Sequence, residues 1–340
     1  MRQLASIQKI DKIERIHDAD RIVLAQIMGW KCVVPINAFN EGDKCVYFEV
    51  DAFLPVEDRF EFLRNSSYKN NEFMGQGFRI KTQTLRGQIS QGLALSLSAF
   101  PEIDPSIEVG TDVTDLLGVR KWDMPEIVGS AGTTIGDKPF GIQTTDETRI
   151  QSIPHILEKF LGKRYYISTK MDGTSCTVAC NNGEIVVCGR NDRYKEEDTC
   201  GMWKLVHDNG WDEKISALGK NIAFQGEFCG PRIQKNRLDL REYHLYIFNV
   251  IDLDTGRWYN LDEMLGICAD IVMETVPIEE IGDDFNYTLE QLLERAKGKY
   301  PSGKNKEGIV IRLTEPEWNG ELRKPLSFKV LNNDFLLKEN

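Results

Sequence analysis

Short runs rich in apolar and β-branched residues, separated by turn-forming residues, fill much of the first hundred positions of the chain. A short apolar run bounded by turn residues is typical of a β-strand, and glycine, asparagine and aspartate between the runs favour tight turns. Closely spaced strands with a polar insert are typical of a small closed barrel, so we predict an all-β, OB-fold-like domain over residues 1–118. The strand-like runs are residues 21–27, 31–36, 44–50, 78–82 and 91–95.

The second half of the chain has a different pattern. Strand-like segments are mixed there with helical periodicity over residues 262–274 and 289–297, without the regular strand–helix alternation of a doubly wound sheet. We therefore predict an α+β domain over residues 146–340. Residues 119–145, between the two domains, are rich in glycine, proline and small polar residues, which predicts a linker.

Composition narrows the class of protein. No uninterrupted apolar stretch approaches the roughly 20 residues of a membrane helix, and the N-terminus lacks the apolar core of a signal peptide. We therefore expect an intracellular protein, cytoplasmic or nuclear, with no membrane partner and no evident obligate protein partner. The eight cysteines include no Cys-x-x-Cys pair, which favours reduced, buried thiols over a zinc site.

The net charge of −11 counts against a protein that coats nucleic acid non-specifically. It does not exclude a nucleic-acid enzyme, because carboxylates that hold metal ions add negative charge and a local basic groove can coexist with an acidic exterior. Any contact with nucleic acid should therefore be confined and sensitive to salt.

A lysine ends the apolar, β-branched run of residues 165–170 and is followed by x-Asp-Gly. A lysine amine can attack the α-phosphate of a nucleotide and hold it as a phosphoramidate, provided that its pKa is low enough to leave it unprotonated. The series Lys170-x-Asp172-Gly173 thus has the form of a covalent nucleotidyltransferase nucleophile. Asp-Gly after a strand is also an ordinary hairpin turn, so the assignment depends on residues downstream.

Further charged and aromatic residues follow Lys170 in a fixed order, each in or beside a strand-like segment. They are Arg190 in Gly189–Asn191, Glu227 in Ala223–Phe228, Phe248 in Tyr246–Val250, Glu307 in Lys306–Arg312 and Lys329 in Ser327–Val330. With these motifs in order across residues 169–329, the chain resembles the covalent nucleotidyltransferase superfamily of ATP-dependent polynucleotide ligases and mRNA capping enzymes. The resemblance implies an adenylyltransferase domain of antiparallel sheets flanked by helices.

The resemblance also implies roles for these residues. Lys170 matches the covalent nucleophile, and Arg190 matches the arginine that contacts the nucleotide or the incoming 5′-phosphate. Phe248 matches the aromatic residue that stacks on the purine, with Val310 on the other face. The remaining members of the nucleotide site are Asp172, Gly173, Glu227 and Lys329.

A highly charged triphosphate needs a divalent cation to neutralise it and to stabilise the departing group. The carboxylates of Glu227 and Glu307 are oxygen ligands suited to Mg²⁺ or Mn²⁺, directly or through water. Asp172 is a third candidate, as a group that orients Lys170 or a metal-bound water. Each carboxylate taken alone is compatible with a solvated strand end, and Asp172 with a simple turn.

The last motif departs from the pattern of the superfamily. Many ligases carry Lys-x-Lys at this place, whereas this chain has Ser327-Phe328-Lys329. Lys329 is the expected contact to the α-phosphate, and Lys324 or Arg323 could replace the missing lysine.

The order of the domains favours one branch of the superfamily. Only eleven residues follow Lys329, whereas DNA ligases and capping enzymes place an OB domain there, and the OB-like unit of this chain stands in front. This arrangement is similar to the Naegleria and Deinococcus type of ATP-dependent RNA ligase. It implies sealing of a 3′-OH RNA end to a 5′-phosphate RNA end through lysyl-AMP and RNA-adenylate, with RNA repair as the setting.

The N-terminal domain would then hold RNA. Its most basic stretch, residues 79–88, contains Arg79, Lys81 and Arg86 among hydroxyl and amide donors suited to phosphate and 2′-OH contacts. A solvated strand face is the competing interpretation. Phe78 could stack on a base, although core packing fits it better.

Three alternatives stay open at the level of the sequence. Within the enzyme class they are DNA nick sealing and GTP-dependent capping. Outside it, the chain could be an RNA-binding module whose nucleotidyltransferase domain is inactive. The presence of Lys170, Glu227, Glu307 and Lys329 counts against the last alternative.

Overall fold

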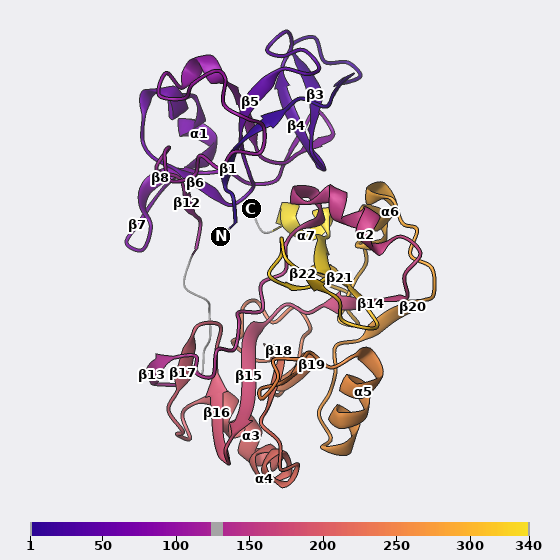
Figure 1. The fold of residues 1–340 in the computed structure, drawn as a ribbon. Coiled ribbons are helices and arrows are strands. Elements are labelled where there is room, and N and C mark those ends of the chain that lie inside the picture. The colour runs from indigo at the N-terminus through magenta and orange to yellow at the C-terminus, as the bar shows by residue number, and fades with distance from the viewer. Residues whose placement is uncertain (1, 124–131, 339–340) are drawn as a thin grey trace. The chain divides into compact units, whose positions relative to one another are not determined.

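The computed structural model describes residues 2–123 and 132–338. The chain divides into two compact units, which are described separately (Figure 1). The first contains residues 2–123 together with Gln151–Pro154 and 336–338, and the second contains most of residues 132–335.

The first unit consists of short antiparallel strands in four sheets, with the orders β1-β5-β11, β2-β3-β4, β12-β6-β8-β7 and β9-β10. A 3₁₀ turn at Asp58–Leu63 leads into the short helix α1 (Arg64–Ser67). The strands are β1 (Ala5–Lys9), β2 (Lys12–Arg15), β3 (Ile22–Ile27), β4 (Trp30–Pro35), β5 (Lys44–Phe48), β6 (Ala52–Leu54), β7 (Tyr68–Asn71), β8 (Gly75–Arg79), β9 (Gln83–Leu85), β10 (Gln88–Ser90), β11 (Leu93–Ser96) and β12 (Arg120–Lys121).

Strand β5 explains how this unit is packed. Successive side chains of a strand point to opposite faces, and here both faces are buried. Cys45 and Tyr47 enter a core built around Trp30, whereas Val46 and Phe48 enter a second core that contains Phe60. Burial on both faces explains why residues 45–48 form a continuous apolar run, with successive side chains in different cores.

The second unit contains a six-stranded sheet, β13-β17-β16-β15-β18-β19, and a four-stranded sheet, β20-β14-β21-β24, both antiparallel. A small hairpin, β22–β23, lies in the connection between β21 and β24. The strands are β13 (Thr134–Asp137), β14 (Tyr165–Lys170), β15 (Thr174–Asn181), β16 (Glu184–Cys188), β17 (Asp192–Tyr194), β18 (Ile222–Cys229), β19 (His244–Asp252), β20 (Ile278–Gly282), β21 (Gly308–Leu313), β22 (Trp318–Asn319), β23 (Lys324–Pro325) and β24 (Ser327–Leu331).

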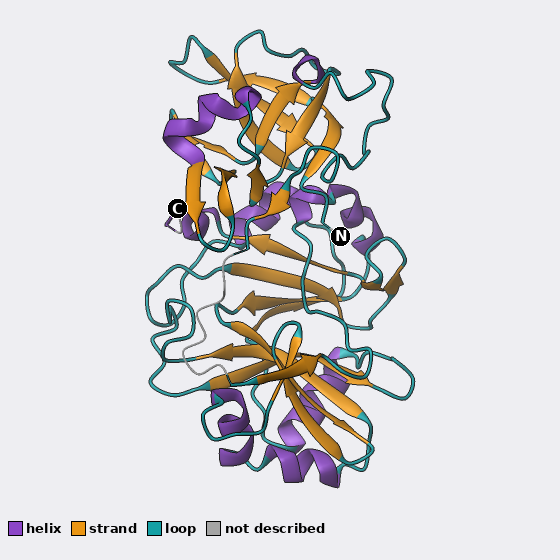
Figure 2. Cartoon of the chain, turned by 90° about the vertical axis from the view of Figure 1, so that its left-hand side faces the viewer, coloured by secondary structure: helices purple, strands orange, loops and turns teal. Residues whose placement is uncertain are grey.

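Helices cover the six-stranded sheet on one side. Apolar residues of α3, α4 and α5 form one core with strands β15 and β18, and Figure 2 shows helices gathered outside the strands at that end of the unit. The helices of this part of the chain are α2 (Leu157–Phe160), α3 (Gly201–Asp208), α4 (Trp211–Ala217), α5 (Leu261–Asp270), α6 (Leu289–Arg295) and α7 (Asn333–Lys338).

The helices predicted at residues 262–274 and 289–297 are present as α5 and α6. Each begins with a capping box, in which Asn260 and Thr288 exchange hydrogen bonds with the third residue of the helix. Helix α5 ends at Asp270, earlier than predicted, because Val272 takes a left-handed conformation with φ 60° and closes the last turn.

Two short strands fall within residues 119–145, the segment predicted as a linker. Strand β12 pairs with β6, and β13 pairs with β17 at the edge of the six-stranded sheet. The described parts of this segment are therefore built into the two units on either side, while residues 124–131 lie outside the described part of the chain. The domain bounds at residues 118 and 146 stay a prediction.

All eight cysteines are buried and free, which agrees with the predicted thiols. Among the described residues, no helix is long and apolar enough to cross a membrane.

Candidate active site

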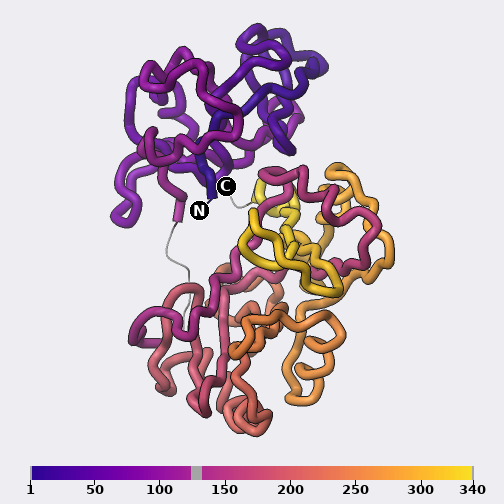
Figure 3. Tube along the Cα trace, viewed as in Figure 1, coloured from indigo at the N-terminus to yellow at the C-terminus, as the bar shows by residue number. Residues whose placement is uncertain are grey.

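The neighbouring strands β14 and β21 bring Lys170 and Glu307 together, although 137 positions separate them in the sequence. Lys170 ends β14 and pairs with Gly308, and the preceding residue is Glu307. Figure 3 shows the yellow C-terminal segment beside the magenta segment that contains β14. The Nζ of Lys170 lies 2.8 Å from the Oε2 of Glu307. Gly308 is required here, because a Cβ would lie 2.1 Å from the carbonyl oxygen of Val330.

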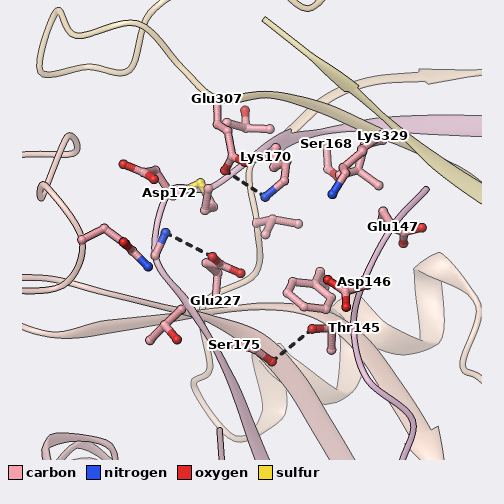
Figure 4. A pocket seen from close by; sticks show the side chains of 18 of the residues that line it. Thr145, Asp146, Glu147, Ser168, Lys170, Asp172, Ser175, Glu227, Glu307 and Lys329 are labelled. Atoms are coloured by element: carbon pink, nitrogen blue, oxygen red, sulfur yellow. Dashed lines mark hydrogen bonds and ion pairs between the residues drawn. The ribbon is translucent and has the colours of Figure 1, made fainter. Parts of the chain in front are cut away.

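A tight turn after Lys170 brings in Glu227 from the other sheet. The backbone N–H of Gly173 donates a hydrogen bond of 3.1 Å to Oε1 of Glu227 (Figure 4). A Cβ at position 173 would lie 2.4 Å from the carbonyl oxygen of Phe228, so only glycine allows the turn to approach β18 this closely. The Asp-Gly sequence is therefore a turn and part of the site at once.

These residues line a cleft of about 360 Å³ within the second unit. Lys324 and Arg323, the two candidates for the missing lysine, do not line this cleft, whereas the other nine residues that the sequence assigns to the nucleotide and metal sites do. They are Lys170, Asp172, Gly173, Arg190, Glu227, Phe248, Glu307, Val310 and Lys329.

Lys324 bonds instead to Glu147 and Asp146. Its ammonium group donates to the carboxylate of Glu147 at 2.5 Å and to the carbonyl oxygen of Asp146 at 2.8 Å. Ser327, which stands where the first lysine of the last motif was expected, donates to the same carboxylate at 2.7 Å. In this structure Lys324 is therefore a partner of Glu147 and not a group that faces the nucleotide site.

Negative charge dominates the surroundings of Lys170. Burial alone lowers the pKa of this lysine, but the carboxylates of Glu307 and Glu227 outweigh burial and raise the pKa above its ordinary value. The structure thus stabilises the ammonium form, whereas attack on a phosphate requires the free amine. Burial and the charge of Glu307 also raise the pKa of Asp172, against the opposite effect of Arg237.

Two residues that the sequence does not single out hold this end of the cleft. The hydroxyl of Tyr300 donates to the carbonyl oxygen of Lys170 at 2.7 Å and accepts from the backbone N–H of Glu307 at 3.1 Å. Arg237 donates to Asp172, with 2.5 Å between Nη1 and Oδ2. The one available signal for Arg237 was the basic run in residues 232–241, directly after the strand that carries Glu227.

Glu147 was also missed. Its carboxylate is buried and accepts from Arg312, Lys324 and Ser327. Burial raises the pKa of Glu147, but the charges of Lys324 and Arg312 outweigh it and lower the pKa to about 2. The guanidinium of Arg312 in turn lies 5.5 Å from the centre of the Phe248 ring. Glu147 therefore organises the wall next to the predicted purine-stacking residue.

Arg190 lies on the same wall and forms an ion pair of 2.5 Å with Asp146. Both side chains line the cleft, so this guanidinium stands at the site and not on a remote surface.

The donor set fits a divalent cation that is shared with a substrate. Glu227, Glu307 and Asp172 offer carboxylate oxygens to one cleft, but the described residues contain no ready-made group of three or more metal-binding side chains. Mg²⁺ is usually held by one or two carboxylates together with water and substrate phosphates, without an all-protein cage. The residues present therefore suit a cation that enters together with a triphosphate.

The predicted RNA-binding residues lie in the first unit, and two of them are close together. The guanidinium of Arg79 lies 5.2 Å from the ring centre of Trp122 and 3.4 Å from a carboxylate oxygen of Asp51. Burial and the neighbouring cations Lys69 and Arg79 lower the pKa of Lys81. Arg86 is exposed, in the turn between β9 and β10.

Comparison with protein families gives two matches along the chain. Residues 4–97 match the model of an OB-fold domain, and residues 163–331 match the model of RNA ligase. The search of curated proteins gives no match.

Solved structures of Naegleria gruberi RNA ligase resemble this chain over nearly its whole length. A mutant with ATP and Mn is 32% identical at a TM-score of 0.91, and the match covers 98% of each chain. A mutant with AMP and Mn is 33% identical at a TM-score of 0.91 over 99% of each chain. A form with PPi is 32% identical at a TM-score of 0.91, again over 99% of each. The predicted OB-fold followed by an α+β domain is confirmed.

Proposed function

The chain belongs to the RNA ligase family, and from this premise we propose that this ATP-dependent enzyme joins a 3′-OH RNA end to a 5′-phosphate RNA end through adenylate carried on Lys170. The observation that carries the proposal is the position of the Lys170 amine. It lies in a cleft beside Glu307, and the same cleft is lined by Glu227, Arg190 and Lys329. A nucleophile, carboxylates and two further cations thus face one space that a nucleotide would fill.

In the first step, the Nζ lone pair of Lys170 attacks the α-phosphorus of ATP. A nitrogen–phosphorus bond forms, the bond between the α-phosphorus and the bridging oxygen breaks, and pyrophosphate leaves with that electron pair. The ammonium must first lose a proton, and the nearest acceptor is Glu307 at 2.8 Å. Arg190 and Lys329 offset the negative charge of the phosphates.

A divalent cation held by Glu227 and Glu307 would neutralise the triphosphate and draw these carboxylates away from the lysine, which favours the free amine. Phe248 and Val310 provide apolar faces for the purine. The Glu147 cluster, which consists of Glu147 and its donors Arg312, Lys324 and Ser327, fixes the wall next to Phe248.

In the second step, the adenylate moves from Lys170 to the RNA 5′-phosphate, so that a phosphoanhydride replaces the phosphoramidate and the lysine is released. In the third step, the 3′-OH attacks the 5′-phosphate, a phosphodiester forms and AMP leaves. We propose repair of broken RNA as the setting. Residues 1–118 would hold RNA, and residues 146–340 would catalyse.

Mass spectrometry of protein incubated with ATP and Mg²⁺ or Mn²⁺ tests the proposal. We expect one adenylate per chain, bonded to Lys170, and no adduct in Lys170→Ala. Lys159→Ala is a matched control, because Lys159 is an exposed lysine of the same unit that pairs with Glu321. A wild-type protein without the adduct, or an adduct on a different residue, would contradict the proposal.

The choice of nucleotide and of nucleic acid separates this function from its relatives. ATP should form the adduct and GTP should not, because GMP transfer would indicate a capping enzyme. RNA with a 3′-OH should be sealed in preference to DNA, and preference for DNA would indicate a DNA ligase. Retention of RNA without any ATP-dependent adduct would indicate an inactive binding module.

The role of the first unit needs its own test. We expect Arg79→Ala, Lys81→Ala and Arg86→Ala to weaken RNA binding and flatten its dependence on salt, while lysyl-AMP formation stays at the wild-type rate. Unchanged RNA affinity in all three variants would assign these cations to the solvated strand face.

A further inference from the structure

The connection between β18 and β19 has an unusual backbone. Four of its non-glycine residues take left-handed conformations: Arg232, Gln234, Asn236 and Asp239, with φ values of 62°, 46°, 41° and 59°. Such conformations are costly for residues with a Cβ and persist only where the surroundings impose them. Gln234 of this connection lines the cleft. The strained backbone of the connection therefore points to a role in the site.

Several contacts fix this connection in place. The side-chain amide of Asn236 bonds both the carbonyl oxygen and the N–H of Leu240, at 3.0 and 3.1 Å. The hydroxyl of Ser302 donates to the carbonyl oxygen of Arg237 at 2.5 Å. Leu240 and Leu238 pack on a core that includes Met171, the residue between Lys170 and Asp172. The connection is therefore fastened against the turn that follows the nucleophile.

One consequence is the position of Arg237. Its guanidinium lies 2.5 Å from the carboxylate of Asp172 and 4.5 Å from the ring centre of Phe335. The side chains of Arg237 and Asp172 are only 12% and 11% exposed, so solvent screens this pair weakly. A planar guanidinium with several donors, stacked on an aromatic ring, holds a carboxylate in a defined orientation.

The ion pair of Arg237 and Asp172 also affects the charges that surround Lys170. Asp172, Glu227 and Glu307 all act on Lys170 as nearby negative charges. If Arg237 were absent, the buried carboxylate of Asp172 would have to turn towards Lys170 or recruit another cation. Each of these outcomes would disturb the arrangement that the nucleophile and the nucleotide need.

We propose that Arg237 is a positioning residue for adenylyl transfer, which acts by fixing the carboxylate of Asp172 and the 171–173 turn so that the cleft binds nucleotide and cation productively. The inference rests on the proposed function, because it assigns a further residue to the same step.

Three substitutions at position 237 test the proposal. Arg237→Met keeps a side chain on Phe335 but removes the charge, and we expect lysyl-AMP formation to slow by about 10- to 100-fold. Arg237→Ala should be at least as slow. Arg237→Lys restores the charge without the planar fork and should recover part of the rate. Arg241→Ala is the matched control, because Arg241 is an exposed arginine of the same connection without a left-handed backbone and should react like the wild type.

A double-mutant cycle shows whether Arg237 acts through Asp172. We expect Arg237→Met combined with Asp172→Asn to be no slower than Asp172→Asn alone. Additive losses would mean that Arg237 acts independently of Asp172 and would overturn the proposal.

Binding measurements remove chemistry from the comparison. In protein that carries Lys170→Ala, calorimetry with ATP and Mn²⁺ should show about tenfold weaker binding when Arg237→Met is added, with thermal unfolding as a check of folding. If the wild type forms no adduct, the proposed function fails. If the wild type forms it and Arg237→Met matches the wild type in rate and affinity, only the role of Arg237 fails.

Discussion

Glu147 and Glu307 are two carboxylates of the same cleft in opposite situations (Figure 4). The side chain of Glu147 is 8% exposed and accepts from two cations and a hydroxyl, which outweigh the cost of its burial. Glu307 is 18% exposed and shares one short contact with Lys170, and further carboxylates lie nearby. The first is electrostatically satisfied, whereas the second stands in a region of excess negative charge.

The difference indicates that the two carboxylates have different roles in one cleft, one structural and one catalytic. A carboxylate whose two oxygens both accept from largely buried donors cannot bind a cation or take a proton without disturbing those hydrogen bonds. A carboxylate with one cationic partner in an acidic region is stabilised when a divalent cation binds, because the cation offsets the repulsion between the neighbouring negative charges. We infer that the Glu147 end holds the wall of the cleft and that the Glu307 end reacts.

The largest expected effect is at the Glu147 end, and it concerns stability. Glu147→Ala leaves Arg312 and Lys324 buried without their shared anion, and we expect a loss of about 3–5 kcal/mol in the free energy of unfolding. Urea denaturation measures this loss. A decrease below about 1 kcal/mol would mean that the cluster is not a structural anchor and would break the comparison.

The pH dependence of stability should carry the signature of Glu147. Its folded-state pKa of about 2 lies below its ordinary value of 4.5, so its contribution is complete above pH 4.5 and is lost as the pH falls towards 2. A pKa difference of about 2.5 corresponds to about 3 kcal/mol. Glu147→Gln should remove this part of the acid sensitivity. An identical pH profile for wild type and variant would count against the pairing.

At the other end of the cleft, the expected effect concerns the reaction. Glu307→Gln keeps the shape but removes the charge, and we expect lysyl-AMP formation to slow by about 100-fold, because proton transfer and cation binding both need the carboxylate. The free energy of unfolding should change by less than about 1 kcal/mol, since the buried ammonium of Lys170 still has Glu227 nearby. If the rate of lysyl-AMP formation and the free energy of unfolding both fell strongly, the two ends of the cleft would not differ in role.

The smallest effect is expected where a pair is exposed. Lys163 and Glu317 form an ion pair of 2.5 Å on the surface of the same unit, with side chains 37% and 56% exposed. Lys163→Ala should cost less than about 1 kcal/mol and leave adduct formation unchanged. A larger loss would show that the contribution of an ion pair to the stability of this protein depends on its distance and not on its burial.

Local patterns were sufficient for much of the fold. The short apolar run in residues 44–50 predicts β5, and the two-residue period of a strand sends Cys45 and Val46 into different cores. Residues 289–297 have the periodicity of a helix, and Thr288 supplies the cap that starts it. In residues 119–145 the composition predicts a linker and misses β13, because the pairing of that strand is decided by the sheet edge that β17 offers.

The chemistry of the site divides in the same way. Lys170, Asp172 and Gly173 lie within four positions of the sequence, and the resemblance carried by the order of Arg190, Glu227, Phe248, Glu307 and Lys329 implied that they share one site with Lys170, as the lining of the cleft shows. Tyr300, Arg237 and Glu147 were not predicted. Only Arg237 had a local signal, the basic run of residues 232–241, and that run does not show which arginine contributes to the site. The partners of these three residues lie 130, 65 and 165 positions away.

The amino-acid sequence by itself determined strands such as β5, helices such as α6, and the lysine that stands at a strand end before a glycine turn, because these depend on local composition, on periodicity and on the small size of glycine. The resemblance of its ordered motifs to the superfamily added the carboxylates that accompany this lysine. Only the tertiary structure decided that Lys324 serves Glu147, that Arg237 restrains Asp172 and that Lys170 stands among carboxylates. Those outcomes depend on burial, which makes each ion costly, and on the charges that strand pairing brings together. The neighbouring charges either offset this free-energy cost or add to it.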